Sequence, residues 1–207
     1  MKIELTIHGV AASASDADQM MLLLREKDGS RMLPVMMSHR RAMLLMARDR
    51  VPLSIPFPVS VSDICHLLMQ QMGTGLKHVE ISAVKDGHLF CNVVAEADGQ
   101  EYSVDYCQAP DGLVMAVTFR CPIMIEEELL ESQYMHNAGN GSFAMNLNTL
   151  TLQMLEDALE QAVASEKYEQ ASFLRDEIRR RREDKDPATT TTLDSLFPED
   201  SDNGASE

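Results

Sequence analysis

Three Asp-Gly dipeptides constrain the fold of this chain more than any other feature. Each lies between two apolar runs, and together they are Asp28-Gly29, Asp86-Gly87 and Asp98-Gly99. Asp-Gly tolerates the positive φ angles of the tight turns that join antiparallel strands. Residues 2–10 predict a further, half-buried strand, because polar and apolar side chains alternate there. The chain is therefore expected to form an antiparallel meander.

Helices are expected between these strands. Ser38 is a suitable N-cap for a helix that ends before Pro52. Residues 112–119 are apolar nearly all round, which predicts a buried helix. Strands and helices mixed in this way predict an α+β domain over residues 1–131, with a mixed, largely antiparallel, hairpin-rich sheet and packed helices.

A second helix is expected to begin at Ser60, with Asp63 in its first turn. Ser is a favoured N-cap, and an acidic residue near a helix N-terminus interacts favourably with the helix dipole. The apolar residues Ile64, Leu67 and Leu68 of this helix are then expected to be buried.

The C-terminal third has a different organisation. Residues 132–150 are rich in Asn and Gly and predict a linker, whereas residues 151–183 predict two helices joined by a turn. Isolated helices of this length are marginal in water, so packing on a partner is expected to stabilise them. The residues expected to bind that partner are Leu155, Leu159, Ala162, Tyr168, Ala171, Leu174 and Ile178.

The remaining residues, 184–207, are acidic and poor in apolar side chains, so a disordered tail is expected. The net charge of the whole chain is -15, which argues against a protein that coats nucleic acid through bulk positive charge. The four cysteines show no disulfide-framework or metal-ligand spacing, and no apolar run is long enough to span a membrane. A cytoplasmic protein is expected.

Residues 155–183 closely resemble the UVR motif of the excision-repair proteins UvrB and UvrC. The matching residues are Leu155, Leu159, Ala162, Glu166, Tyr168-Glu169, Ala171 and Leu174-Arg175-Asp176. In that family the motif is an antiparallel helical hairpin for self-association or for binding another hairpin. The resemblance therefore implies a protein partner.

Residues 1–131 resemble the bifunctional nuclease family in the order of their elements and in the sequence Leu33-Pro34-Val35. Members of that family often carry a UVR motif after the domain, as this chain does. The resemblance implies cleavage of DNA and RNA.

The chain departs from the motifs of that family at three places. An acidic residue of the family corresponds to Arg41, and a Thr-His-Asp tripeptide corresponds to Val61-Ser62-Asp63. The Arg-Pro-Ser-Asp-Ala element corresponds to residues 108–112 and keeps only Asp111. These departures leave the fold inference intact and weaken the inference of activity.

Phosphodiester hydrolysis generally uses Mg²⁺-type ions held by carboxylates, or a general base with cationic groups. Asp63, Asp105 and Asp111 are the candidate catalytic carboxylates, with Mg²⁺ or Mn²⁺ as the expected cofactor. The structural alternative makes Asp111 a helix cap, Asp63 a partner of the helix dipole and Asp105 a strand end. Candidate nucleic-acid-binding residues are Arg40, Arg41 and Arg48, which alternatively form the solvated face of a helix.

Two function hypotheses follow. In the first, the protein is a nuclease of DNA or RNA whose UVR hairpin recruits another protein. In the second, the N-terminal domain is an inactive adaptor that acts through the hairpin and an oligomeric interface. Because the sheet must cover its strand edges and the chain holds 15 methionines, residues 1–135 are expected to form a homodimer.

Overall fold

A computed structural model describes residues 1–12, 18–50, 60–139, 142–144 and 150–183 of the chain. Its strands are β1 (Lys2–Ala12), β2 (Gln19–Glu26), β3 (Met32–Ser38), β4 (Gly75–Lys85), β5 (His88–Ala97), β6 (Gln100–Gln108), β7 (Ile123–Glu126), β8 (His136–Gly139) and β9 (Ser142–Ala144). Its helices are α1 (His39–Arg50), α2 (Val61–Gln71), α3 (Ala109–Phe119), α4 (Glu127–Gln133), α5 (Leu152–Ala164) and α6 (Tyr168–Glu183). The expected α+β class with a C-terminal helical hairpin is confirmed.

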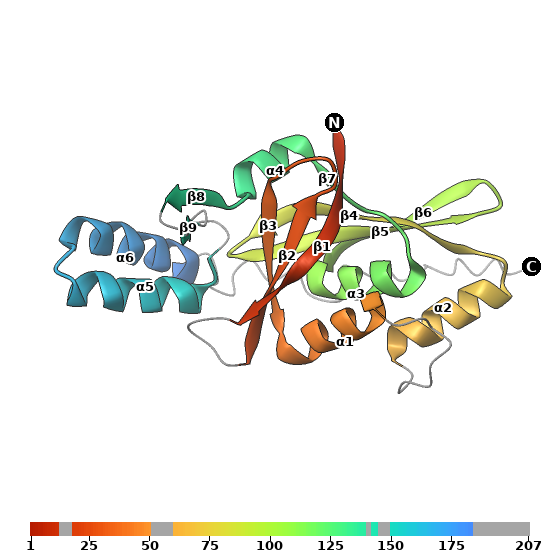
Figure 1. Cartoon of the computed structure of the whole chain (residues 1–207), viewed down its shortest axis with the longest axis horizontal. Helices are drawn as coiled ribbons and strands as arrows, with labels where there is room; N and C mark the ends of the chain where they lie inside the picture. The colour runs from red at the N-terminus through yellow and green to blue at the C-terminus, as the bar shows by residue number, and fades with distance from the viewer. Residues whose placement is uncertain (13–17, 51–59, 140–141, 145–149, 184–207) are drawn as a thin grey trace, which may run out of the picture. The chain divides into compact units, whose positions relative to one another are not determined.

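Seven strands form one mixed sheet in the order β3-β2-β1-β7-β4-β5-β6 (Figure 1). The sheet consists of two antiparallel meanders, β1-β2-β3 and β4-β5-β6, rather than the single one expected. Strand β7 joins them, because it pairs antiparallel with β1 and parallel with β4. A pattern of local turns predicts hairpins but carries no signal for such a long-range strand insertion.

The Asp-Gly turns differ from one another. Both residues have positive φ at Asp86-Gly87 (52° and 78°) and at Asp98-Gly99 (51° and 75°), as a type I′ hairpin turn requires. The third dipeptide, Asp28-Gly29, lies in a longer connection between β2 and β3 and has no positive φ. All three still join antiparallel neighbours, as predicted.

Helices α1, α2 and α3 lie on one side of the sheet (Figure 1). Buried apolar residues of the sheet and of α1 and α3 form a continuous core, which includes Leu22, Leu45, Ile81 and Leu113. The expectation of a buried third helix is confirmed, since six residues of α3 are buried.

Helix α2 begins with the expected cap, but its apolar face is not buried. Ser60 and Asp63 form a capping box, in which the Asp63 N–H donates to the Ser60 hydroxyl and the Ser60 N–H donates to the Asp63 carboxylate. The predicted burial of Ile64, Leu67 and Leu68 is wrong, because each is about half exposed or more. The helix instead packs through its polar face, which carries the buried Ser62 and Asp63.

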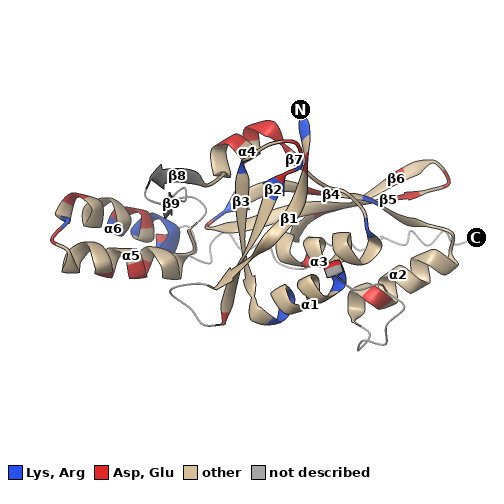
Figure 2. Cartoon of the chain, viewed as in Figure 1, with Lys and Arg blue, Asp and Glu red and all other residues tan. Residues whose placement is uncertain are grey.

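The segment 132–150, interpreted as a linker, contains regular structure. The end of α4 lies there, and β8 and β9 pair as a separate two-stranded sheet. Arg31 forms ion pairs with Glu127 and Glu131 of α4, which is rich in acidic residues (Figure 2). The expected tail, 184–207, lies outside the described residues.

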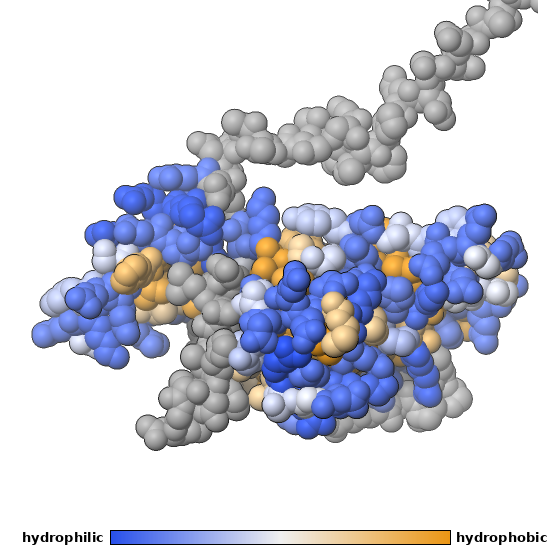
Figure 3. All heavy atoms as spheres, turned by 90° about the horizontal axis from the view of Figure 1, so that it is seen from above, coloured by the Kyte–Doolittle hydropathy of each residue, from blue (hydrophilic) through white to orange (hydrophobic). Residues whose placement is uncertain are grey.

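The chain divides into two compact units, residues 1–157 and 158–207. Helices α5 and α6 are connected at Glu166, whose φ of 56° is left-handed, with the Lys167 N–H donating to the Ala162 carbonyl and the Glu166 N–H to the Val163 carbonyl. This is the hydrogen-bond pattern of a Schellman motif, which ends a helix sharply. The face shown in Figure 3 is mostly hydrophilic, with smaller hydrophobic groups. Among the described residues, no helix has the length and apolar character that a membrane span requires.

Candidate functional site

The start of α3 is held tightly against the sheet. A Cβ atom at Gly112 would lie 2.3 Å from the Cys91 sulfur on β5, so only glycine allows this approach. The packing fixes the position of Asp111, which lies one residue earlier in the first turn of α3. Burial raises the pKa of Cys91 to about 12, so its thiol is a packing group rather than a nucleophile.

Arg41 of α1 binds Asp111 through a two-point ion pair. Its Nε donates to Oδ1 at 2.7 Å and its Nη2 donates to Oδ2 at 3.0 Å. Both side chains are accessible to solvent, with 40% of Arg41 and 54% of Asp111 exposed. The sequence named both residues as candidates but gave no signal that they form a pair.

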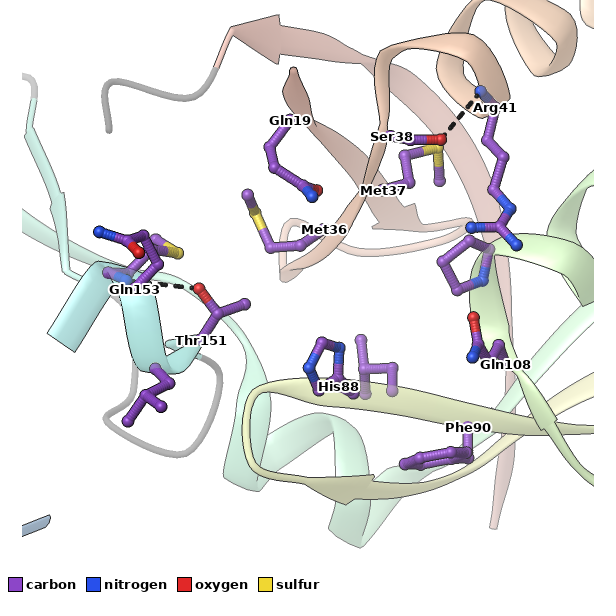
Figure 4. Close-up of a pocket in the computed structure, with 14 residues that line it drawn as sticks. Gln19, Met36, Met37, Ser38, Arg41, His88, Phe90, Gln108, Thr151 and Gln153 are labelled. Carbon is purple, nitrogen blue, oxygen red and sulfur yellow. Dashed lines mark hydrogen bonds between the residues drawn. The ribbon is translucent and has the colours of Figure 1, made fainter. Parts of the chain in front are cut away.

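A pocket of about 480 Å³ opens beside this pair. Its lining includes Ser38 and Arg41 of the β3–α1 segment, His88 and Phe90 of β5, and Gln108 at the end of β6 (Figure 4). The whole lining holds one guanidinium, one imidazole, two hydroxyls and three amides, the last two groups from Ser38 and Thr151 and from Gln19, Gln108 and Gln153. Such a combination of donors suits an anionic ligand.

Helices α1 and α3 both begin at this pocket, and the start of α5 also lines it. Ser38 and Arg41 line it at the start of α1, where the Ser38 hydroxyl accepts the Arg41 N–H at 3.4 Å. Gln108 and Pro110 line it at the start of α3, whose N-cap residue Gln108 makes no side-chain capping bond. Helix N-termini carry partial positive charge, so both dipoles favour negative charge near this pocket.

A second ion pair joins α1 to α2. The Arg48 Nη2 donates to the Asp63 Oδ2 at 2.5 Å, and only 6% of each side chain is exposed. The same carboxylate oxygen accepts the Ser60 N–H and hydroxyl, at 2.8 and 2.7 Å. Burial raises the pKa of Asp63, but the hydrogen bonds from Ser60 and Arg48 outweigh it and hold the pKa below its ordinary value.

The buried pair continues into a small polar network. The Ser60 and Ser62 hydroxyls lie 2.8 Å apart, and the Thr118 hydroxyl lies 3.3 Å from that of Ser62. Thr118 stands near the end of α3, whereas Asp111 stands at its start. Seven residues of helix separate them by about 10 Å along the axis. The carboxylates of Asp63 and Asp111 therefore lie near opposite ends of α3.

The third candidate carboxylate, Asp105, lies on the exposed strand β6 and accepts a hydrogen bond from the Ser103 hydroxyl. Within the described residues, no group of three His, Cys, Asp or Glu side chains is placed to hold a metal ion. The donor set at the pocket thus does not match a preformed divalent-cation site, since its lining has no carboxylate and the adjacent Asp111 is engaged by Arg41.

The remaining basic candidate, Arg40, is exposed at the start of α1. The three candidate arginines accordingly have three environments, since Arg41 lines the pocket and Arg48 is buried.

The predicted partner-binding residues of the hairpin also fall into classes. Leu155, Ala162, Ala171 and Ile178 are buried, Leu159 and Leu174 are half-buried, and Tyr168 is 67% exposed. Two further apolar residues, Val163 and Phe173, are exposed, at 52% and 74%. The sequence analysis missed both because it followed a single stripe on each helix.

The charged end of α6 is tightly paired. Glu177 accepts hydrogen bonds from Arg180 and from Arg181, of which Arg181 is only 1% exposed. The hydrogen bonds from Arg180 and Arg181 outweigh the opposing effect of burial and together lower the pKa of Glu177 to about 2.

Comparison with known protein families agrees with this architecture. The bifunctional nuclease domain model matches residues 22–138, more than half of the chain. The chain belongs to the bifunctional nuclease domain family. The UvrB/UvrC motif model matches residues 152–183, which contain α5 and α6. No curated protein matches the chain.

The range matched by the bifunctional nuclease domain contains the whole pocket lining except Gln19 and residues 151–154 at the start of α5. The sequence analysis missed His88, Phe90 and Ser38 as pocket residues. Their only sequence signal was position: Ser38 ends β3, and His88 follows the Asp86-Gly87 turn. The matched range begins after β1, although β1 lies between β2 and β7 in the sheet.

Proposed function

We propose that this bifunctional nuclease domain hydrolyses phosphodiester bonds of DNA or RNA in the pocket lined by Arg41, with Asp111, the ion-pair partner of Arg41, beside it. Membership of the family carries the proposal, and the chemistry of the pocket supports it. Arg41 and two helix N-termini favour a phosphate group there. Asp111 is the carboxylate beside that phosphate.

The ion pair suggests how the substrate engages these residues. A phosphate that binds the Arg41 guanidinium competes with the Asp111 carboxylate for the same donors. Once released, Asp111 is free to accept a proton from the attacking water as a general base. Arg41 then neutralises the negative charge that develops on the phosphate oxygens.

The described residues offer no donor set that matches a divalent metal ion, so the roles of Arg41 and Asp111 are proposed without one. Dependence on Mg²⁺ or Mn²⁺ is a separate part of the proposal. It is tested by assaying cleavage with each ion and with a chelator.

The test is a cleavage assay on single- and double-stranded DNA and RNA. Asp111→Asn is expected to abolish most activity, and Asp105→Asn and Asp63→Asn test the other candidate carboxylates. Asp49→Asn is the matched control, because Asp49 is an exposed aspartate of α1 outside this pocket. Absence of cleavage of every substrate, with every ion, would contradict the proposal.

An adaptor function is the second candidate. One observation favours it: position 41, where the family has an acidic residue, holds an arginine whose guanidinium donates to both carboxylate oxygens of Asp111. In this case the exposed residues Val163, Tyr168 and Phe173 would bind another protein through the UVR hairpin.

Cytoplasmic location is part of both proposals, consistent with the free thiols of all four cysteines.

The hairpin proposal is tested in the full chain. Phe173→Asp places a charge on an exposed position and is expected to weaken capture of a UVR-bearing partner at least about tenfold. Arg175→Asp is the control for a charge change on the same helix, where Arg175 is exposed. If Phe173→Asp and wild type capture the partner equally well, Phe173 is not part of the interface.

A further inference from the structure

Strand β6 contains a β-bulge close to the pocket. The register between β5 and β6 shifts there, so the single residue Asn92 of β5 lies opposite two residues of β6, Asp105 and Tyr106. Phe90, which lines the pocket, lies two residues before Asn92 on the same strand. Bulges re-aim the side chains of the bulged strand and are frequent beside active sites. The bulge therefore draws attention to where Asp105 and Tyr106 point.

The backbone of Tyr106 is held in an unusual conformation. Its φ of 58° is left-handed, which a bulky aromatic residue rarely adopts because its Cβ crowds the backbone. The side chain of Asn92 fixes this conformation, since its Oδ1 accepts the Tyr106 N–H at 3.2 Å and the Ser82 hydroxyl at 3.1 Å. Strained backbone of this kind persists where the surroundings enforce it, and it clusters at ligand sites.

The result of this conformation is a stack of two aromatic rings at the pocket. The rings of Tyr106 and Phe90 have centroids 4.2 Å apart and planes within 10° of parallel. Phe90 lines the same pocket as Arg41 and Gln108, and Gln108 is its partner across the strands (Figure 4). Tyr106 nevertheless remains 58% exposed. The stack is therefore a solvent-accessible aromatic platform that begins at the lining of the pocket.

The charges near the platform favour a neutral occupant. Strand β6 has no Lys or Arg and carries two carboxylates, those of Glu101 and Asp105. These charges repel a phosphate, whereas Arg41 at the pocket attracts one. A nucleobase is planar and neutral, and every base has a π-face that stacks on aromatic side chains. Pocket and platform thus suit the two different parts of a nucleotide chain.

We propose that Tyr106, supported by Phe90, is a stacking subsite for an unpaired base of a single-stranded nucleic acid whose phosphate binds at Arg41. The inference rests on the proposed function, because it assigns a base of the same substrate. In a duplex the bases are stacked on one another, so only a base that has left the stack can lie on Tyr106. The subsite makes single-stranded DNA or RNA the preferred substrate class, without a strong sequence preference.

The experiment measures binding of the full chain to two labelled strands of equal length by fluorescence anisotropy. One strand is single-stranded oligothymidine, and the other is an abasic strand with the same backbone. Tyr106→Asn removes the ring, and Asn is among the residues that tolerate a left-handed backbone. It is expected to weaken binding of oligothymidine at least about fivefold, the lower end of the effect of one base–aromatic stack. Binding of the abasic strand is expected to be unchanged.

The salt dependence gives a second readout. Tyr106→Asn removes no phosphate contact, so the slope of affinity against salt concentration is expected to equal that of wild type. The preference of wild type for oligothymidine over a duplex of the same length is expected to shrink in this variant, because the duplex does not use the platform.

Two variants control for effects on the fold. Tyr102→Asn removes a second tyrosine of the same strand, which is 55% exposed, and is expected to bind both strands as wild type does. Tyr106→Trp keeps a large ring at the platform and is expected to bind oligothymidine at least as tightly as wild type. The urea midpoint of each variant, measured on the same preparation, shows that the chains compared are folded.

Three outcomes would overturn the subsite. These are equal binding of oligothymidine by Tyr106→Asn and wild type, an equal loss of affinity for oligothymidine and the abasic strand, and the same loss with Tyr102→Asn. A wild type that binds neither strand would overturn both the subsite and the proposed function. Binding of oligothymidine that depends on Tyr106, without cleavage, would support the subsite and contradict hydrolysis alone. Cleavage with no effect of Tyr106→Asn on binding would contradict the subsite alone.

Discussion

Two arginine–aspartate pairs link α1 to its neighbours, and they differ in almost everything except their chemical groups. Arg41–Asp111 is a two-point pair whose side chains are 40% and 54% exposed, beside a pocket of about 480 Å³. Arg48–Asp63 has both side chains 6% exposed and shares its carboxylate with the capping box of α2. The first is available to a ligand, and the second is part of the packing between helices.

The difference shows that a charged residue type does not by itself indicate a role. Exposed ion pairs contribute little to stability because solvent screens them, whereas breaking a buried pair leaves an uncompensated charge. We therefore expect substitutions at Arg48 to act on folding and substitutions at Asp111 to act on function. Each of the following predictions tests this division.

The largest effect is expected from Arg48→Ala. Removal of the guanidinium leaves the Asp63 charge buried with fewer donors, which is expected to destabilise the fold by about 3–5 kcal/mol. Urea unfolding monitored by circular dichroism measures this loss. The double variant Arg48→Met, Asp63→Asn is expected to recover most of it, because an amide oxygen at position 63 can still accept the Ser60 N–H and the amide carries no charge. A loss of unfolding free energy below about 1 kcal/mol for Arg48→Ala would show that the buried pair contributes no more to stability than an exposed pair does.

Asp111→Asn is expected to separate function from stability. If Asp111 is a general base, cleavage should fall at least about a hundredfold. Asn keeps the size and hydrogen-bonding capacity of the side chain at a helix start, so the urea midpoint should hardly change. The cleavage rate and the midpoint are measured on the same preparation. An unchanged rate would assign Asp111 an ion-pairing role only.

The stability of the buried pair should also depend on pH. Because the pKa of Asp63 is held below its ordinary value of 3.8, the ionised form stabilises the fold above about that pH. This contribution is lost as the pH falls through the lower, folded-state pKa. The difference in unfolding free energy between wild type and Asp63→Asn should accordingly be constant near neutral pH and shrink below pH 3.8. A constant difference down to pH 2 would contradict the role of Asp63 as a buried anion.

The sequence predicted those parts of the fold that depend on local chemistry. Asp86-Gly87 and Asp98-Gly99 form their turns because only a few residues tolerate positive φ. Ser60 begins α2 because its hydroxyl satisfies a free N–H. The insertion of β7 between β1 and β4 was not predicted, because strand pairing across more than a hundred residues leaves no local pattern.

The candidate site was predicted in its residues but not in its arrangement. Asp63, Asp105 and Asp111 were expected as a cluster, whereas Asp63 and Asp111 lie toward opposite ends of α3 and each has its own arginine. Sequence spacing could not distinguish these partners, since Arg41 and Arg48 lie on one helix seven residues apart. The exposed side of α2 was mispredicted for a related reason: an apolar stripe does not reveal which face of a helix packs on the domain.

The smallest effect on stability is expected from Arg41→Ala. Its ion pair with Asp111 is exposed, so its loss should change the unfolding free energy by less than about 1 kcal/mol. Binding to nucleic acid should respond more clearly, because loss of one phosphate contact lowers the slope of affinity against salt concentration by about 1. Arg41→Lys keeps the charge but cannot form the two-point pair, and is expected to retain the slope while binding more weakly. Fluorescence anisotropy with a labelled oligonucleotide, at several salt concentrations, measures both quantities. If Arg41→Ala leaves affinity and slope unchanged while destabilising the fold as much as Arg48→Ala, the two pairs have the same structural role and the pocket is not a phosphate site.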